Sequence, residues 1–281
     1  MKILIVTHDK EHYRDRSRRM RWSWLPYYFE RLGHEVEYIT KQRWPWYPLI
    51  YVRFRPDTVI GVGKTGALIT ALHHKLRPRA RFVFDLNDHP HFYRSEQRMQ
   101  FLIKNHDIVT TPSHHYHQRY RCHALVMNGS NFTPKKAKKA YDIIYIGQTH
   151  SIYNISAVQE ACKASGISLR VISTLSLAET EQEIAKAALC LYPLSWDASA
   201  KMTDYAAMGK AVVAIRPNLA EEISYPAHYT LDVITGIKSM LHDNGQRKAL
   251  EKQARAWFLR HAGTWERQAK RYLAAVDAIS F

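Results

Sequence analysis

Cysteine is scarce in this sequence. The three cysteines, Cys122, Cys162 and Cys190, lie far apart, are odd in number and form no Cys-x-x-Cys pair in 281 residues. Disulfide frameworks and zinc sites need paired or clustered cysteines. The sequence therefore indicates neither kind of site, and we expect three buried free thiols.

Long apolar runs are also missing. The opening residues, MKILIVTHDK, hold a short apolar run that ends at His8 and Asp9. This run is too short for the core of a signal peptide, and no stretch nears the roughly 20 apolar residues that a membrane-spanning helix needs. We expect a soluble, cytoplasmic protein.

Acidic residues are few relative to basic ones. The chain has 41 Lys and Arg against 25 Asp and Glu, and its formal net charge of +16 predicts a polyanionic partner or surface. Two segments, residues 13–24 and 41–55, alternate arginine with aromatic residues. Such a mixture suits an anionic membrane interface, and it also suits single-stranded nucleic acid, whose bases stack on rings. A third interpretation is a basic surface with several of these rings in the core.

A nucleotide-binding motif is present only in part. Within residues 59–74, VIGVGKTGALITALHH, Gly63, Lys64 and Thr65 match the end of a P-loop, but the first glycine of that motif would have to stand at Thr58. We therefore interpret Gly63 as a tight turn that needs a positive φ. An anion site at the N-terminus of the following helix is the alternative.

Short apolar runs alternate with helix-length amphipathic segments along the whole chain. The runs that we expect to be strands are residues 2–7, 35–40, 58–62, 81–86, 108–112, 124–127, 142–147, 169–173, 189–193 and 211–215. This alternation is typical of a doubly wound α/β protein. A polar, lysine-rich segment, NFTPKKAKKAYD, separates the first six runs from the last four. We predict two Rossmann-like domains, residues 1–134 and 141–262, and a ligand cleft between them.

Eight segments, in order along nearly the whole chain, resemble the family-four-like group of GT-B glycosyltransferases (glycosyl transferases group 1). They are LPYYFERLGHEVEYIT, RPDTVIGVGKTGALITALHHKL, RFVFDLNDHPHFYR, NHDIVTTPSHHYHQRY, HALVMNGSNF, YDIIYIGQTH, DASAKMTDYAAMGKAVVA and TWERQAKRYLAAV. The resemblance implies a transferase that uses a nucleotide sugar, retains anomeric configuration and needs no metal or other cofactor. It also implies that residues 263–281 form a closing helix that returns to the first domain.

The resemblance places a donor site in the second domain. Asp204 stands where the group has a glutamate that contacts ribose hydroxyls at the start of a helix, with Thr203 and Lys201 just before it. The free N–H groups of such a helix start favour phosphate, and Lys201 would add positive charge. From the residues alone, the same stretch is an ordinary helix start with Asp204 in the first turn and Lys201 exposed.

The sequence departs from the group's pattern at two places in this site. Counting back from Asp204, the group's first glutamate would fall on Trp196, with Asp197 one place later. Trp196 is either a stacking platform for a base or sugar, or a packed loop anchor. Gln148 and Thr149 follow Gly147 where the group usually has a phosphate-binding arginine, so the charge has to come from elsewhere. Lys201 is the first candidate, and an arginine of the first domain, such as Arg14 or Arg16, is the weaker alternative.

The resemblance also places a catalytic site in the first domain. Asn87 stands where a site histidine is common in the group, and it is followed by Asp88 and His89. These residues end a buried strand, where open α/β folds bind ligands, and the imidazole of His89 suits proton transfer near neutral pH. A surface loop rich in histidine is an equally good interpretation.

The prediction of the acceptor rests only on charge and aromatic content. We expect the two basic aromatic segments to form one surface for a lipid-linked or envelope-glycan acceptor at the inner face of the membrane. The residues of this expected surface are Arg18, Arg19, Arg21, Trp22, Trp24, Trp44 and Trp46. Two alternatives stay open: a protein that binds nucleic acid or glycosylates DNA bases, and a GT-B-like protein that only binds its ligand.

Overall fold

A computed structural model describes residues 1–8, 21–74, 79–87, 95–147, 155–173, 175–192, 200–215 and 225–278. The chain forms two compact units: unit 1 comprises Met1–Met127 with Trp265–Phe281, and unit 2 comprises Asn128–Thr264. The lysine-rich segment expected to be a linker groups with unit 2, where Thr133 donates a backbone hydrogen bond to Glu181 and Lys135 forms an ion pair with the same carboxylate. The boundary therefore lies ahead of this segment.

Unit 1 contains one parallel sheet whose strands lie in the order β2-β1-β3-β4-β5-β6. Its strands are β1 (Lys2–Val6), β2 (Glu35–Ile39), β3 (Thr58–Val62), β4 (Arg81–Asp85), β5 (Ile108–Thr111) and β6 (Ala124–Leu125). Strands β3 and β5 are buried along their whole length. Apolar runs without polar alternation form such strands because helices cover both faces of the sheet.

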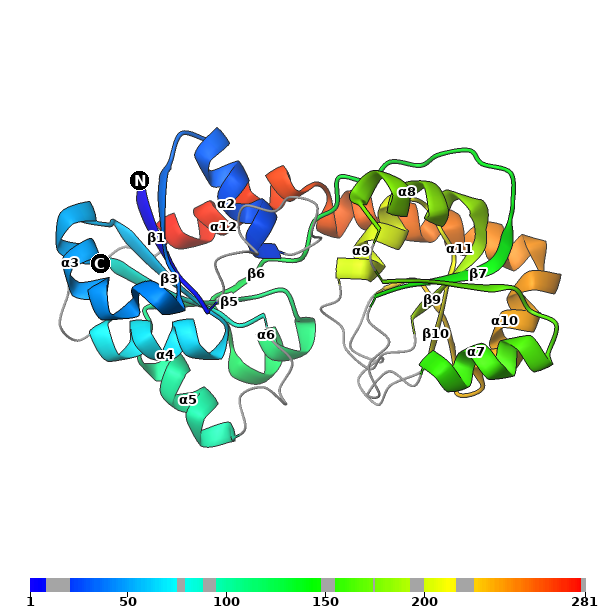
Figure 1. Cartoon of the computed structure of the whole chain (residues 1–281), viewed down its shortest axis with the longest axis horizontal. Helices are drawn as coiled ribbons and strands as arrows, with labels where there is room; N and C mark the ends of the chain where they lie inside the picture. The colour runs from blue at the N-terminus through cyan, green and yellow to red at the C-terminus, as the bar shows by residue number, and fades with distance from the viewer. Residues whose placement is uncertain are drawn as a thin grey trace. The chain divides into compact units, whose positions relative to one another are not determined.

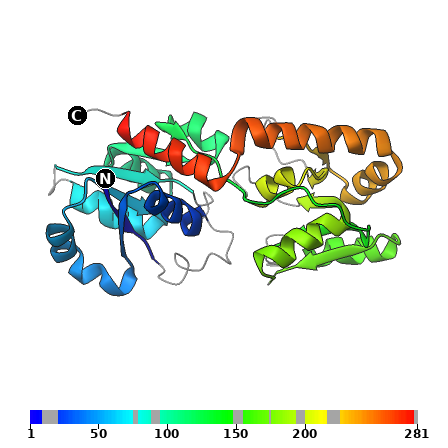
Figure 2. The same cartoon turned by 90° about the horizontal axis from the view of Figure 1, so that it is seen from above.

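Two helical layers cover this sheet (Figures 1 and 2). The helices of unit 1 are α2 (Arg21–Arg31), η1 (Lys41–Trp46), α3 (Tyr47–Phe54), α4 (Gly63–His74), α5 (Glu96–Lys104), α6 (His114–Tyr120) and α12 (Trp265–Asp277). Helix α12, the last in the chain, packs beside α2 on the face of the sheet that presents Ile3 and Ile5. Helix α3 covers Leu4 and Val6 on the opposite face.

The glycine-rich stretch after β3 brings α4 against the sheet. Gly63 has a φ of 63°, the positive value expected there. A Cβ added to Gly66 would lie 2.2 Å from the carbonyl oxygen of Val6, and one added to Gly61 would lie 2.3 Å from Oγ1 of Thr70. These glycines therefore permit close packing of a helix on strands, which accounts for the partial P-loop pattern structurally.

Unit 2 contains a second parallel sheet, in the order β11-β10-β9-β7-β8. Its strands are β7 (Tyr141–Ile146), β8 (Leu169–Ile172), β9 (Ala187–Tyr192), β10 (Val212–Ile215) and β11 (His228–Thr230). Its helices are α7 (Ile155–Ala164), α8 (Leu177–Lys186), α9 (Ala200–Ala207), α10 (Val233–His242), α11 (Asn244–Trp257) and the π-helical turn η5 (Phe258–Ala262). Helices α7 and α10 cover one face, and α8, α9 and α11 lie on the other (Figure 1).

Two further expectations concern single groups and long helices. All three cysteines are buried free thiols, as predicted. Burial raises the pKa of the Cys122 thiol to about 12. In the part of the chain that the structure describes, no helix combines the length and the apolar character needed to cross a membrane.

Candidate functional site

In open α/β folds, ligands bind at the carboxyl edge of the sheet, where the parallel strands end. In unit 2 this edge includes the end of β7 and the start of α9. Gly147 directly follows β7 and has a φ of 138°, a backbone conformation that side chains disfavour. A glycine here leaves room for another group to approach the backbone.

That group is the amine of Lys201, in the first turn of α9. Its Nζ donates a hydrogen bond to the hydroxyl of Tyr145 at 3.0 Å and lies 4.8 Å from the centre of the tyrosine ring. A Cβ on residue 147 would come within 2.2 Å of this Nζ. The structure thus brings together Gly147 and Lys201, two predicted donor-site residues that are far apart in sequence, and places a cation at the end of β7.

The carboxylate of Asp204 lies one turn further along α9. Asp204 is only 4% exposed, and its Oδ1 accepts a 2.6 Å hydrogen bond from the hydroxyl of Ser130. Ser130 is itself buried, and its backbone N–H donates to the carbonyl of Gly263. The interpretation from the residues alone, an ordinary helix start with Asp204 in its first turn, is therefore wrong: Asp204 lies beyond the first turn of α9, and a hydrogen bond from Ser130 holds it inside unit 2.

Two buried tyrosines fix α9 in place. The hydroxyl of Tyr205 accepts from the backbone N–H of Ile146 at 3.1 Å, and the hydroxyl of Tyr225 donates to the carbonyl of Met202 at 3.0 Å. Burial raises the pKa of Tyr225 well above its usual value, so this hydroxyl keeps its proton. Neither tyrosine was predicted as a site residue, because each acts through a backbone partner that is distant in sequence.

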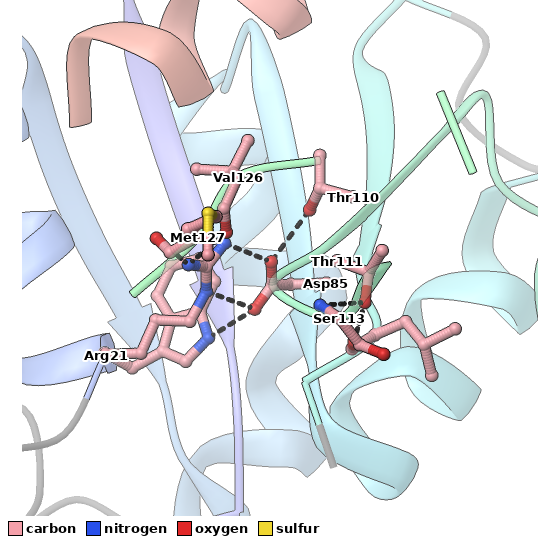
Figure 3. A network of polar contacts seen from close by, with 9 residues as sticks. Arg21, Asp85, Thr110, Thr111, Ser113, Val126 and Met127 are labelled. Carbon is pink, nitrogen blue, oxygen red and sulfur yellow. Dashed lines mark hydrogen bonds and ion pairs between the residues drawn. The ribbon is translucent and has the colours of Figure 1, made fainter. Parts of the chain in front are cut away.

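In unit 1 the carboxyl edge of the sheet is organised around Asp85, the last residue of β4 (Figure 3). Its buried carboxylate accepts two hydrogen bonds from Arg21, both at 3.0 Å, one from Trp22 at 2.8 Å and one from Thr110 at 2.7 Å. We call these four side chains the Asp85 network. It ties the start of α2 to the ends of β4 and β5.

Arg21 extends the Asp85 network to the end of the first chain segment of unit 1. Its Nη1 donates to the carbonyl of Val126 at 2.7 Å and to that of Met127 at 3.1 Å (Figure 3). A buried guanidinium with a bidentate carboxylate and two carbonyls has its charge compensated and most of its donors used. Arg21 therefore stabilises the interior of unit 1.

This network corrects part of the expected acceptor surface. Arg21 and Trp22 are buried, so the prediction that they face a membrane is wrong. Trp24 is partly buried and stacks on Tyr28 with ring centres 6.1 Å apart. Arg18 and Arg19 lie outside the described residues. The second basic aromatic segment differs: Trp44 is partly buried, whereas Trp46 is 61% exposed.

The remaining predicted site residues are described only in part. Asn87 follows β4 closely, and its backbone N–H donates to the carbonyl of Asp85 at 3.1 Å, so it does lie at the carboxyl edge of the sheet. Thr203 is buried in α9. The others are outside the described residues: Asp88, His89, Gln148, Thr149, Trp196 and Asp197.

No family model matches the sequence, and no curated protein matches it. Solved structures do. Sucrose-phosphate synthase from Thermosynechococcus elongatus is 10% identical, with a TM-score of 0.71 over 99% of this chain and 98% of that one. HepE from Anabaena, solved with UDP and glucose, is 12% identical, with a TM-score of 0.69 over 99% and 100%.

A third match is an alpha-glucosyltransferase solved in complex with UDP, which is 11% identical, with a TM-score of 0.65 over 99% of this chain and 100% of that one. At such low identity these likenesses establish the fold. The predicted GT-B fold, with two parallel-sheet Rossmann-like domains, is confirmed.

Proposed function

We propose that this chain is a nucleotide-sugar-dependent glycosyltransferase of the family-four-like group. The observation that carries the proposal is the cation at the end of β7, where Lys201, in the first turn of α9, lies against the backbone of Gly147. A cation and a helix N-terminus at the carboxyl edge of a parallel sheet suit a diphosphate. Solved structures with the same fold hold UDP, which supports this assignment.

In the proposed site each described residue has a distinct role. Lys201 exchanges its hydrogen bond with Tyr145 for the donor's phosphates and stabilises the departing diphosphate without a metal ion. Asp204 accepts hydrogen bonds from hydroxyls of the donor, and Ser130 orients its carboxylate. Gly147, with no side chain, leaves the phosphates access to Lys201. Gln148, Thr149, Trp196 and Asp197 complete the donor site, and Thr203 supports it from within α9.

The proposed function also assigns roles to residues of unit 1. Asn87, Asp88 and His89 follow β4 and bind the transferred sugar or the acceptor, and His89 takes up the acceptor's proton. The proposed reaction retains anomeric configuration. The proposed acceptor is lipid-linked or an envelope glycan at the inner face of the membrane, which is consistent with the net charge of +16.

A thermal-shift screen of nucleotide sugars tests the donor site. A ligand at a hundred times its dissociation constant stabilises the folded protein by about 2.7 kcal/mol, so the screen identifies both base and sugar. Lys201→Met should reduce the shift strongly, because it removes the cation at β7. Lys270→Met is the matched control, since Lys270 is exposed and pairs with Glu266 within α12.

Two results would contradict the proposal. If no nucleotide sugar stabilises the folded protein, the donor site is wrong. If one binds but is neither hydrolysed nor transferred to any acceptor in a membrane extract, the chain is a GT-B-like binding protein. Retention on DNA that falls steeply with salt, together with transfer to DNA, would instead identify a nucleic-acid acceptor.

A further inference from the structure

Helix α3 is apolar on two opposite faces. Tyr47 and Tyr51 are buried and pack with Val59 and Phe82 in the core. Leu49 and Val52, by contrast, are 64% and 50% exposed. With about 100° between successive residues of a helix, the pair Leu49 and Val52 points away from the pair Tyr47 and Tyr51. A helix that is apolar all round normally has a partner on each side.

Trp46 extends the outward face of α3. It is 61% exposed and precedes Leu49 by one helical turn. Trp44, two residues earlier, turns inward: its Nε1 donates to the carbonyl of Thr7 at 3.3 Å, and its ring meets that of His8. We define the α3 stripe as the three exposed residues Trp46, Leu49 and Val52.

The rim of the α3 stripe is basic. Lys41, Arg43, Arg53 and Arg55 are exposed, and residues 41–56 contain no acidic side chain. Arg43 pairs with Glu37 at 2.8 Å, and Asp57, which follows this segment, accepts a hydrogen bond from the backbone N–H of Lys2 at 2.7 Å. An apolar stripe with tryptophan at one end and cations at both ends has the chemistry of a helix that lies in the interface of an anionic bilayer.

Other occupants fit this surface less well. Single-stranded nucleic acid binds through rings that stack on its bases, whereas two of the three stripe residues are aliphatic. A second copy of the chain would bring two basic rims together on proteins that each carry a net charge of +16, so the two copies would repel each other. Anionic lipid satisfies both the apolar stripe and its basic rim.

We propose that the α3 stripe docks unit 1 onto an anionic lipid surface. Its use in presenting a lipid-linked acceptor rests on the proposed function. The stripe starts at Trp46, the last residue of η1. This 3-10 helix begins after the end of β2 and is held to the end of β1 by Trp44 and by a hydrogen bond from the backbone N–H of Lys41 to the carbonyl of His8. Figure 1 shows α3 at the periphery of unit 1. The docking surface therefore starts at the carboxyl edge of the sheet, where the acceptor's head group would be bound.

Sedimentation with vesicles tests this surface. The full chain should bind vesicles of mixed phosphatidylcholine and phosphatidylglycerol at low salt, and pure phosphatidylcholine far more weakly. The variant Trp46→Ser/Leu49→Ser/Val52→Ser should lose roughly tenfold or more of this binding. Lys41→Gln/Arg53→Gln should lose roughly 25-fold at low salt, about fivefold for each charge, and less at high salt.

The matched control is Leu231→Ser/Leu259→Ser in unit 2, which removes two leucines that are 85% and 55% exposed. This control should bind vesicles as the unaltered chain does. Circular dichroism and the thermal shift with a nucleotide sugar show that each variant is folded. Because these readouts are separate, a chain that sediments but binds no nucleotide sugar refutes the proposed function and supports the stripe.

Several results would overturn the inference. The inference is wrong if the unaltered chain does not sediment with anionic vesicles at low salt, or if the triple serine variant binds as tightly as the unaltered chain. Equal losses in the unit 2 control would show that the effect is not specific to α3. A dimer in solution that the triple variant converts to monomers, with no vesicle binding, would assign the stripe to a second copy of the chain.

Discussion

Removing one partner of the Asp85 network should destabilise unit 1 severely. Asp85→Ala deletes the acceptor of four hydrogen bonds and leaves the guanidinium of Arg21 buried with only the carbonyls of Val126 and Met127. Leaving a buried charge without its partner costs about 3–5 kcal/mol. Trp22 and Thr110 lose their acceptor as well, so we expect the upper half of that range.

The magnitude can be apportioned with a double-mutant cycle. Arg21→Met leaves the carboxylate with two neutral donors and should cost a similar amount. The double variant, Arg21→Met/Asp85→Ala, leaves no buried charge and should cost at least about 2 kcal/mol less than the sum of the two single changes. Arg43→Met is the control, because its ion pair with Glu37 is exposed and is worth at most about 1 kcal/mol.

Urea unfolding followed by circular dichroism measures these changes. Two units need not unfold together, so the curve is fitted with a transition for each, and only that of unit 1 should move. If Asp85→Ala lowers the free energy of unfolding by less than about 1 kcal/mol, or if the cycle is strictly additive, the reasoning is refuted and Arg21 lies at the protein surface.

Three further predictions follow from single groups. Gly147→Ala should weaken nucleotide-sugar binding, seen as a smaller thermal shift, because its Cβ would displace Lys201; Gly245→Ala, where no positive φ is needed, should leave binding unchanged. Gly66→Ala should lower the urea midpoint of unit 1, because its Cβ would lie 2.2 Å from the rigid carbonyl oxygen of Val6; an unchanged midpoint would disprove the close packing of α4. Burial lowers the pKa of His106 to about 4, whereas in the unfolded chain this imidazole has its usual pKa of about 6.5. Between these two pH values the unfolded chain binds a proton at His106 and the folded chain does not. The free energy of unfolding should therefore fall by roughly 3 kcal/mol as the pH drops from about 6.5 to 4, and His106→Gln should lose this dependence; an equal pH dependence in the variant would refute it.

The sequence predicted the sheets better than the site. Apolar runs identify β1, β3 and β7 because strands buried on both faces carry no polar alternation. Strand β11 was missed, since three partly buried residues, His228–Thr230, leave too short a pattern. Glycine spacing indicated a turn at Gly63. The close contacts of Gly61 and Gly66 could not be predicted, because they depend on how α4 packs against the strands.

The site could be predicted only where its chemistry is local. Lys201 and Asp204 lie in one short segment that resembles the group's pattern, whereas the partner of Asp204 is 74 residues away, at Ser130. Arg21 belongs to a run of arginines that is typical of a protein surface, and its hydrogen-bond acceptor, Asp85, is 64 residues further along the chain. Burial of a charge depends on such distant partners, so composition alone assigned Arg21 and Trp46 to one surface.

The discontinuity of unit 1 also imposes an order on biosynthesis. The core under α2 is closed by Trp265, Tyr272 and Val276 of α12, residues made after all of unit 2. Until the ribosome has added them, Trp22 and Phe29 lack the ring of Tyr272 that covers them in the folded chain. Unit 2 is complete in sequence before that point. The nascent chain therefore exposes the apolar face of unit 1 while unit 2 emerges, which is the stage at which it is most open to aggregation and to chaperones.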